Sequence, residues 1–196
     1  NSYERIKSYL INTPIVNSDK LNKLLNSNIY LKNEVEQLTG SFKIRGALSA
    51  LSNLKNKGIN GVVAYSSGNH AQGVSKAAQI FDMHAIIVMP EDAPQNKIQK
   101  TKANGAEVVL YKRHIESREE IAIKIAEDKN YPLVKPFDNE DIIAGQGSFG
   151  LEACEFFLAN NIKPDIVLSC TSGGGLVAGT SIAFKHYFPD VEIYPV

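Results

Sequence analysis

Short apolar runs rich in β-branched residues alternate with helical patterns from about residue 60 to the end of the chain. The apolar runs have the length of buried strands, and the segments between them repeat their apolar positions at the spacing of amphipathic helices. The predicted strands are 61–64, 85–89, 107–110, 166–169 and 192–194. The predicted helices are 71–81, 95–103, 118–128, 148–158 and 176–186. This alternation predicts an α/β fold with parallel sheets and right-handed crossovers.

The first part of the chain shows an extended segment, a turn and then a helix. The extended segment at 29–32 precedes Gly40 and Ser41, which we expect to form the turn and the N-cap of that helix. Apolar residues then recur at helical spacing over 44–54. This pattern places Lys43 in the first helical turn.

Proline residues punctuate the middle of the chain, and we predict a small inserted α/β domain at 59–138. The larger domain is then built from 1–58 together with 139–196. The final residues, 192–196, read as a buried strand that enters a sheet. We therefore expect the parent protein to continue beyond Val196 and the larger domain to be incomplete in this sequence.

Composition narrows the class of protein. Basic and acidic residues are equal in number, 21 of each among 196 residues, so neither a nucleic-acid footprint nor attraction to a membrane surface is indicated. No apolar run approaches the roughly 20 residues that span a bilayer. Cys154 and Cys170 lack metal-like spacing and read as reduced core residues of a cytoplasmic protein. The four histidines are too scattered to predict a zinc site.

Lys43 is the only basic residue in the otherwise uncharged stretch 39–44. The positive end of the helix dipole disfavours an ammonium group there, and desolvation beside Phe42 would lower the pKa of the amine further. A neutral amine is what a Schiff base to an aldehyde cofactor requires. The alternative is a lysine whose stem lies along the helix while its charge reaches water.

A polar octet follows the predicted strand 61–64; it reads Ser66-Ser67-Gly68-Asn69-His70-Ala71-Gln72-Gly73. A strand, a hydroxyl-rich turn and a helix form an anion-binding arrangement, because free backbone N–H groups and serine hydroxyls point outward. Asn69 adds an amide that can donate to an oxyanion or a phenolate. The alternative is a simple helix cap by Ser66 or Asn69, but so dense a polar segment is costly without a ligand.

Three consecutive glycines follow the predicted strand 166–169, in the segment Ser172-Gly173-Gly174-Gly175-Leu176-Val177-Ala178-Gly179. Glycines that open a helix let backbone amides close on a phosphate, and the helix N-terminus adds its partial charge. The segment lacks the patterns of nucleoside-triphosphate and dinucleotide loops, which leaves a small monophosphate. The alternative, a flexible glycine turn, suits one glycine better than three.

Ligands of open parallel sheets bind at the carboxyl ends of the strands, where all three motifs fall. Together they predict a phosphate cup, an amide facing a ring and a poised lysine. Pyridoxal 5′-phosphate carries an aldehyde, a phenolate oxygen and a monophosphate, and it matches this set.

These residues resemble the second fold type of pyridoxal-phosphate enzymes, which is tryptophan synthase β-like, and within it the serine/threonine dehydratase and serine racemase group. The resemblance covers essentially the whole chain and is carried most specifically by Ser41-Phe42-Lys43-Ile44-Arg45-Gly46-Ala47. The segment Ala144-Gly145-Gln146-Gly147, ahead of the predicted helix at Ser148, is also similar to this group. The resemblance implies two open, twisted parallel-sheet domains flanked by helices.

The resemblance also implies roles for individual residues. Lys43 would form the Schiff base, Phe42 would pack beside the cofactor ring, and Asn69 would hydrogen-bond the ring hydroxyl. Ser66 and His70, with the surrounding amides, would hold the substrate carboxylate. The phosphate cup would be Ser172, Gly173, Gly174, Gly175 and Leu176, although the family usually has a glycine where this chain has Ser172.

Two further residues sort members within the group. Ser67 stands where many threonine dehydratases carry alanine and serine racemases carry serine, and it would be a second acid/base on the face opposite Lys43. Arg118 is similar to an arginine that reaches the substrate in racemases; the alternative is a solvated residue paired with nearby glutamates. Leu38 replaces the nucleotide-contacting lysine of animal racemases, which argues against nucleotide activation.

The expected activity is α,β-elimination of L-serine or L-threonine to a 2-oxo acid and ammonia. The alternatives are a serine racemase, with or without dehydratase activity, a 3-hydroxyaspartate dehydratase, a β-replacement enzyme and a non-catalytic cofactor-binding fragment. The resemblance further suggests a homodimer, and any divalent-cation site would lie beyond Val196. The expected partner is a small amino-acid substrate.

Overall fold

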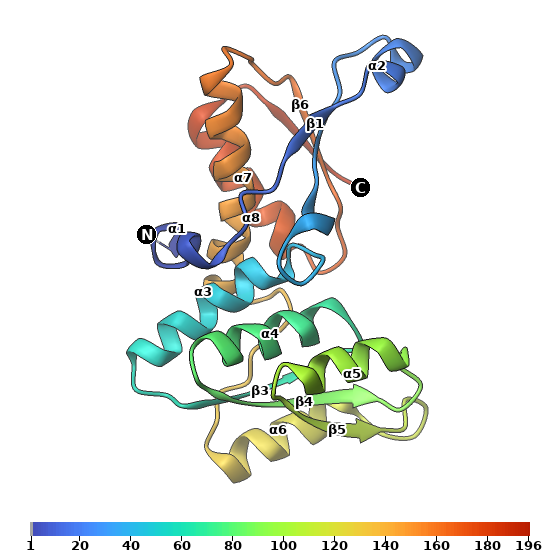
Figure 1. The fold of residues 1–196 in the computed structure, drawn as a ribbon, viewed down its shortest axis with the longest axis vertical. Helices are drawn as coiled ribbons and strands as arrows, with labels where there is room; N and C mark the ends of the chain where they lie inside the picture. Colours follow the sequence, from blue (N-terminus) through green and yellow to red (C-terminus); the bar gives the residue numbers. More distant parts are fainter. Residues whose placement is uncertain (1) are drawn as a thin grey trace.

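The computed structural model describes residues 2–196 and arranges them as two parts on either side of a central helix, α3 (Lys43–Asn56) (Figure 1). The lower part in this view holds one three-stranded sheet with its helices. The upper part holds two two-stranded sheets and two long helices. Helix α3 packs against both parts. We propose that the two parts correspond to the small and large domains predicted from the sequence.

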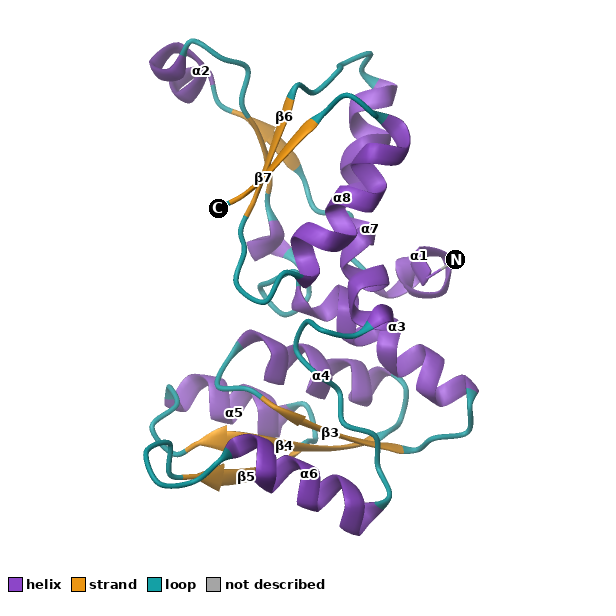
Figure 2. Cartoon of the chain, turned by 180° about the vertical axis from the view of Figure 1, so that it is seen from behind, coloured by secondary structure: helices purple, strands orange, loops and turns teal. Residues whose placement is uncertain are grey.

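The lower part contains a parallel sheet in the order β3 (Gly61–Tyr65), β4 (His84–Pro90), β5 (Glu107–Tyr111). Figure 2 shows helices α4 (Asn69–Ile80) and α5 (Gln95–Ala103) on one face and α6 (Arg118–Lys129) on the other. The central strand β4 is buried from Ala85 to Pro90, as expected for a parallel strand covered on both faces. The predicted α/β class with parallel sheets is confirmed.

The upper part contains a parallel pair, β6 (Ile166–Ser169) and β7 (Glu192–Pro195), and the helices α7 (Glu140–Ala159) and α8 (Gly175–Tyr187). An antiparallel pair, β1 (Ile15–Asn17) and β2 (Tyr30–Lys32), lies in the same part. The remaining elements are α1 (Ser2–Ile6), α2 (Asp19–Leu25), which projects from the body (Figure 1), and two 3₁₀ turns, Lys7–Tyr9 and Glu34–Glu36. Within residues 2–196, no helix is long and apolar enough to cross a membrane.

Helix α7 begins eight residues before the predicted start at residue 148, at Glu140, so Ala144-Gly145-Gln146-Gly147 lies inside it. Asn139 caps the helix, because its Oδ1 accepts a hydrogen bond from the Ile142 N–H at 3.1 Å. A Cβ on Gly145 would lie 2.5 Å from the Arg45 carbonyl oxygen of α3. A Cβ on Gly179 of α8 would lie 2.5 Å from the Gly147 nitrogen. These glycines permit close helix–helix contact and do not break the helix.

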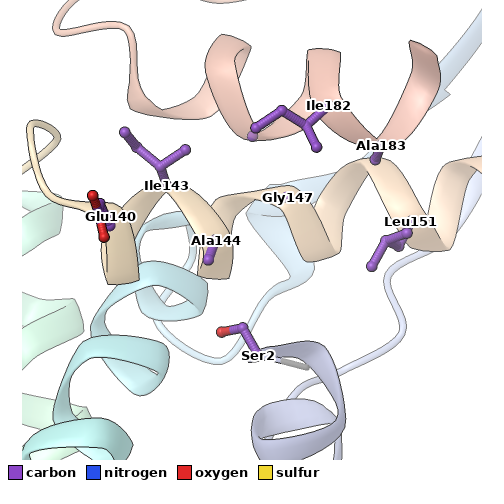
Figure 3. Close-up of a pocket in the computed structure, with 9 residues that line it drawn as sticks. Ser2, Glu140, Ile143, Ala144, Gly147, Leu151, Ile182 and Ala183 are labelled. Atoms are coloured by element: carbon purple, nitrogen blue, oxygen red, sulfur yellow. The ribbon is translucent and has the colours of Figure 1, made fainter. Parts of the chain in front are cut away.

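An apolar pocket lies beside this contact, between α1, α7 and α8 (Figure 3). Side chains of Ile143 and Leu151 from α7 and Ile182 from α8 line it. None of the residues predicted to bind cofactor or substrate belongs to its lining.

Two predictions about burial are wrong. The strand at 192–196 is largely exposed, and Tyr194 keeps 47% of its surface accessible. Cys170, directly after β6, is exposed, whereas Cys154 is buried as predicted. Both corrections have one cause: the β6–β7 pair is covered on one face only. Within residues 2–196, α7 and α8 pack against that face. Side chains on the other face remain exposed, as Leu168 does at 66%.

A buried ionic cluster joins α3 to the upper part. The Arg45 side chain is fully buried and donates to both carboxylate oxygens of Glu34 and of Glu152 at 2.7–2.8 Å. Lys32 of β2 lies 2.8 Å from a Glu152 oxygen and donates to the Thr13 carbonyl at 3.0 Å. Burial lowers the pKa of Lys32, against its hydrogen bond with Glu152. Each charge therefore has partners, which is the condition for burying it.

Candidate active site

Lys43 is the first residue of α3, as the sequence pattern predicts. Gly40 adopts a φ of 71°, the left-handed conformation expected of the turn before it. The predicted N-cap at Ser41 is wrong. Phe42 occupies the cap position without a side-chain hydrogen bond, and the Ser41 hydroxyl is buried without a partner among the described residues.

The Lys43 side chain points into the protein and does not extend to bulk water. Its Nζ donates a hydrogen bond to the Pro136 carbonyl oxygen at 2.8 Å and lies 5.2 Å from the centre of the Phe42 ring. Burial lowers the pKa of this amine, as predicted. Gly73 of α4 allows the close approach from the other side, since a Cβ there would lie 3.1 Å from the Lys43 carbonyl group.

The polar octet forms the turn between β3 and α4. Gly68 is the N-cap residue of α4, and no side chain caps this helix, so a simple cap by Ser66 or Asn69 is excluded. The Ser66 hydroxyl instead accepts from the Gly68 N–H at 3.2 Å within the turn. The Ser67 hydroxyl makes no hydrogen bond to any residue in 2–196 and is free to meet a ligand.

His70 and Asn69 face different environments although they are neighbours. The His70 ring is 3% exposed, and its Nε2 lies 3.1 Å from the Val134 carbonyl oxygen. Burial lowers the pKa of His70 to about 4, and the charge of Lys43 acts in the same direction, so the ring is neutral at pH 7. Asn69 is exposed, and its Oδ1 accepts from Lys97 Nζ at 2.9 Å. The His70 Nε2 is thus used within the fold, while the Asn69 amide nitrogen has no acceptor within residues 2–196.

Each of the three consecutive glycines occupies a position where a larger residue would not fit or would be strained. Gly174 has a φ of 85° and is the N-cap residue of α8. A Cβ on Gly173 would overlap the Phe137 ring at 2.1 Å, and one on Gly175 would lie 2.9 Å from the Phe137 carbonyl oxygen. Backbone N–H groups of residues 172–174 have no acceptor within residues 2–196. The turn therefore presents unused donors at a helix N-terminus, which is an anion-binding arrangement.

The segment Val134–Phe137 brings the predicted residues together. Its Val134 carbonyl contacts His70, its Pro136 carbonyl holds Lys43, and its Phe137 packs on the glycine turn. No sequence motif marks this segment as part of the site. Pro136 is one of the prolines that punctuate the middle of the chain, but its carbonyl contact with Lys43 depends on tertiary packing and leaves no local sequence pattern.

Arg118 begins α6 and is exposed, with its guanidinium stacked 5.2 Å from the centre of the Tyr65 ring. Its Nε donates to Glu119 at 2.8 Å, and this hydrogen bond raises the pKa of Arg118. Tyr65 directly precedes Ser66, so the stacking holds Arg118 near the polar octet. The predicted role of Arg118 toward the substrate stays a prediction.

The chain belongs to the family of pyridoxal-phosphate dependent enzymes, whose family model matches residues 6–196. It is 40% identical over 193 residues to L-threo-3-hydroxyaspartate ammonia-lyase from Saccharomyces cerevisiae, covering 98% of this chain and 58% of that protein. It is 38% identical over 195 residues to a serine racemase from Schizosaccharomyces pombe, covering 98% and 59%. It matches the crystal structure of a serine racemase from Dictyostelium discoideum with a TM-score of 0.89 at 36% identity, covering 99% and 62%. A crystal structure of a threonine deaminase matches with a TM-score of 0.90 at 43% identity, covering 98% and 61%.

These matches confirm the resemblance to fold type II enzymes. The chain spans less than two thirds of the length of each of these relatives. Among residues 2–196, no group of three or more His, Cys, Asp or Glu side chains could hold a metal ion. A divalent cation stays a prediction.

Proposed function

We propose that this chain carries the cofactor lysine and phosphate turn of a pyridoxal-phosphate-dependent ammonia-lyase. The proposed reaction is the α,β-elimination of L-serine or L-threonine to a 2-oxo acid and ammonia. One observation carries the proposal. Lys43 Nζ donates to the Pro136 carbonyl oxygen, and the glycine turn packs closely against the next residue, Phe137. This placement favours one ligand that carries both an aldehyde and a phosphate.

The donor set fits pyridoxal 5′-phosphate. The amides of residues 172–174 and the N-terminus of α8 suit a monophosphate, and Gly174 gives the turn its left-handed conformation. Asn69 offers an amide donor, and Phe42 lies beside the lysine. When bound, the cofactor supplies the electron sink that makes the α-proton of an amino acid removable.

The protein's residues then bind the substrate and move protons. Lys43 Nζ, with its pKa lowered by burial, is the proposed base that takes the proton from the substrate α-carbon. The Ser66–His70 turn offers hydroxyls and first-turn amides for the α-carboxylate. His70 would take part through its backbone, because its Nε2 is committed to Val134.

Two alternatives share this site. Racemisation is favoured by the free hydroxyl of Ser67, which is proposed as a second acid/base. Action on 3-hydroxyaspartate is favoured by Arg118, which could bind a second carboxylate, and by the 40% identity to an enzyme named for that substrate. A homodimer and the predicted cytoplasmic location also stay proposals.

The test is to incubate the protein and pyridoxal 5′-phosphate with L-serine, L-threonine and L-threo-3-hydroxyaspartate. Oxo-acid release and formation of the D-isomer are followed together. Lys43→Ala should abolish the visible absorbance of bound cofactor and all turnover, while Lys57→Ala, an exposed residue after the end of α3, serves as the control. Near-normal activity of Lys43→Ala would defeat the proposal. Cofactor absorbance without turnover of any substrate would instead support the non-catalytic alternative.

Ser67→Ala separates the first two activities. If Ser67 returns a proton to the face opposite Lys43, the substitution should suppress racemisation far more than elimination. Equal loss of both would show that Ser67 only orients the substrate.

A further inference from the structure

Lys97 is placed at the candidate site by α5. Its Nζ donates a hydrogen bond to Asn69 Oδ1 at 2.9 Å, and Asn69 is the first residue of α4. Helix α5 is itself held in place, because Ile98 and Thr101 are buried and Asn104 Nδ2, at the end of the helix, donates to Ser75 Oγ of α4 at 3.0 Å. Lys97 therefore extends from a fixed helix and not from a loose loop.

The contact determines which end of the Asn69 amide is available. A side-chain amide has one acceptor end and one donor end, and the two are exchanged by a half turn of the group. Lys97 occupies the acceptor end. The Nδ2 group has no acceptor within residues 2–196 and lies on an exposed side chain. In the opposite orientation the two donors would meet, so the lysine disfavours that flip.

The charge of Lys97 has no carboxylate partner within 4 Å among the described residues. An ammonium group beside the first turn of α4 is electrostatically unfavourable, since that end of the helix is positive. The Lys97 ammonium group, the Asn69 Nδ2 group and the N-terminus of α4 lie together here, and an anionic oxygen would balance their positive charge and accept a hydrogen bond.

We propose that Lys97 is a positioning residue, which holds Asn69 so that its Nδ2 donates to an anionic aromatic oxygen. This inference rests on the proposed function, in which that oxygen belongs to the pyridoxal 5′-phosphate ring. Lys97 does not touch the cofactor in this account. It acts by fixing the orientation of the Asn69 amide.

The competing explanation is a simple tie between α4 and α5. A tie would stabilise the fold equally with or without cofactor and would not depend on the amide of Asn69. A positioning role predicts a loss of cofactor affinity that disappears once that amide is removed.

The experiment measures the dissociation constant for pyridoxal 5′-phosphate and the position of its visible absorbance band in the purified protein. The variants are Lys97→Met, Lys97→Arg, Asn69→Ala and the double variant Lys97→Met/Asn69→Ala. Lys100→Met is the matched control, because Lys100 is exposed on the same helix and its loss changes the net charge equally.

We expect Lys97→Met to weaken cofactor binding about tenfold, the scale of one lost charge-assisted hydrogen bond, and to shift the band. Lys97→Arg, which keeps a donor and the charge, should restore binding to within about threefold. In the Asn69→Ala background the Lys97→Met change should have little further effect.

Equal affinity of Lys97→Met and Lys100→Met would overturn the proposal. So would an undiminished Lys97→Met effect in the Asn69→Ala background, since the lysine would then act without the amide. Failure of the proposed function is distinguishable, because the unsubstituted protein would then show either no visible band or a band without turnover of any substrate, whatever the effect of the Lys97 variants.

Discussion

The sheets on the two sides of α3 differ in how fully they are covered. In the lower part, α4 and α5 cover one face and α6 the other, and Ile87 of β4 is fully buried. In the upper part, Ile166 and Leu168 of β6 remain 56% and 66% exposed. Parallel strands are ordinarily buried on both faces. The lower sheet is thus enclosed by its own helices, while the upper part relies on α7, α8 and the ionic cluster around Arg45.

The candidate site draws on both parts. The lower part contributes the Ser66–His70 turn and Lys97, and the upper part contributes the glycine turn. Helix α3 contributes Lys43 between them, and Val134–Phe137 contacts each group. Because the two parts are stabilised differently, changes that loosen the upper part should disturb the glycine turn first.

Removal of the Arg45 guanidinium group should cause the largest difference in stability between the upper and lower parts. Within residues 2–196, Arg45→Ala leaves Glu34 without an ion-pair partner and Glu152 with Lys32 alone, and removing one partner of a buried ion pair costs about 4 kcal/mol. Urea unfolding measures the loss. Hydrogen exchange should show reduced protection across 140–187 with protection retained over 61–111.

The control for this prediction is Arg113→Ala. Arg113 and Asp92 form a salt bridge in which both side chains are about half exposed, so no measurable change in stability is expected. Uniform loss of protection in both parts of Arg45→Ala would refute the idea that they are separately stabilised.

Truncating one strand residue in each sheet tests the difference in coverage directly. Ile87→Ala removes a fully buried side chain and should lower the free energy of unfolding by about 3 kcal/mol. Leu168→Ala removes a side chain that is 66% exposed and should cost less than about 1 kcal/mol. Chemical denaturation of the two variants gives both values. Similar losses would mean that the outer face of β6 is covered in solution.

The strands and helices from residue 61 onward were predictable because their apolar periodicity is regular. The start of α7 was missed, since Gly145 and Gly147 read as helix breakers when only the sequence is considered. Their actual role, close contact with α3 and α8, depends on packing between distant segments. The short strands β1 and β2 were not assigned as a pair, because three residues each carry too little pattern.

The same division applies to the site. The sequence alone indicated Lys43, the polar octet and the glycine turn, because their residue types are energetically costly at those positions unless they bind a ligand. Phe137 and Lys97 did not, because a phenylalanine or lysine in a loop or an exposed helix has no distinctive local pattern. Phe137 lies 36 residues before its partner Gly173 in the sequence, and Lys97 lies 28 residues after its partner Asn69. Sequence motifs find ligand contacts more readily than they find the residues that hold those contacts in place.

Protonation of His70 tests the stability of the lower part, to which this residue belongs. The pKa of this ring is about 4 in the folded protein and 6.5 as the reference value. The unfolded chain therefore binds the proton first, and the stability contributed above pH 6.5 is lost as the pH falls toward 4. Between pH 7 and pH 5 the loss should be about 2 kcal/mol.

Urea unfolding at the two pH values measures this loss, and His70→Gln provides the comparison. Glutamine can still donate to the Val134 carbonyl but does not titrate, so its stability should change less between pH 7 and pH 5. An unchanged pH dependence in His70→Gln would assign the effect to other groups.

Phe137→Ala should have the smallest effect on stability and the most local one. The side chain is 40% exposed, so its truncation should cost about 1 kcal/mol. Its ring nevertheless occupies the space beside Gly173, and its removal leaves the turn without that support. Hydrogen exchange of the first turn of α8 should accelerate while exchange in β4 is unchanged. Phe81→Ala, another partly buried ring in the lower part, is the control and should leave the glycine turn unaffected. If exchange at 173–176 is the same in Phe137→Ala as in the unsubstituted protein, Phe137 does not brace the turn, and the glycines hold their conformation through backbone preference alone.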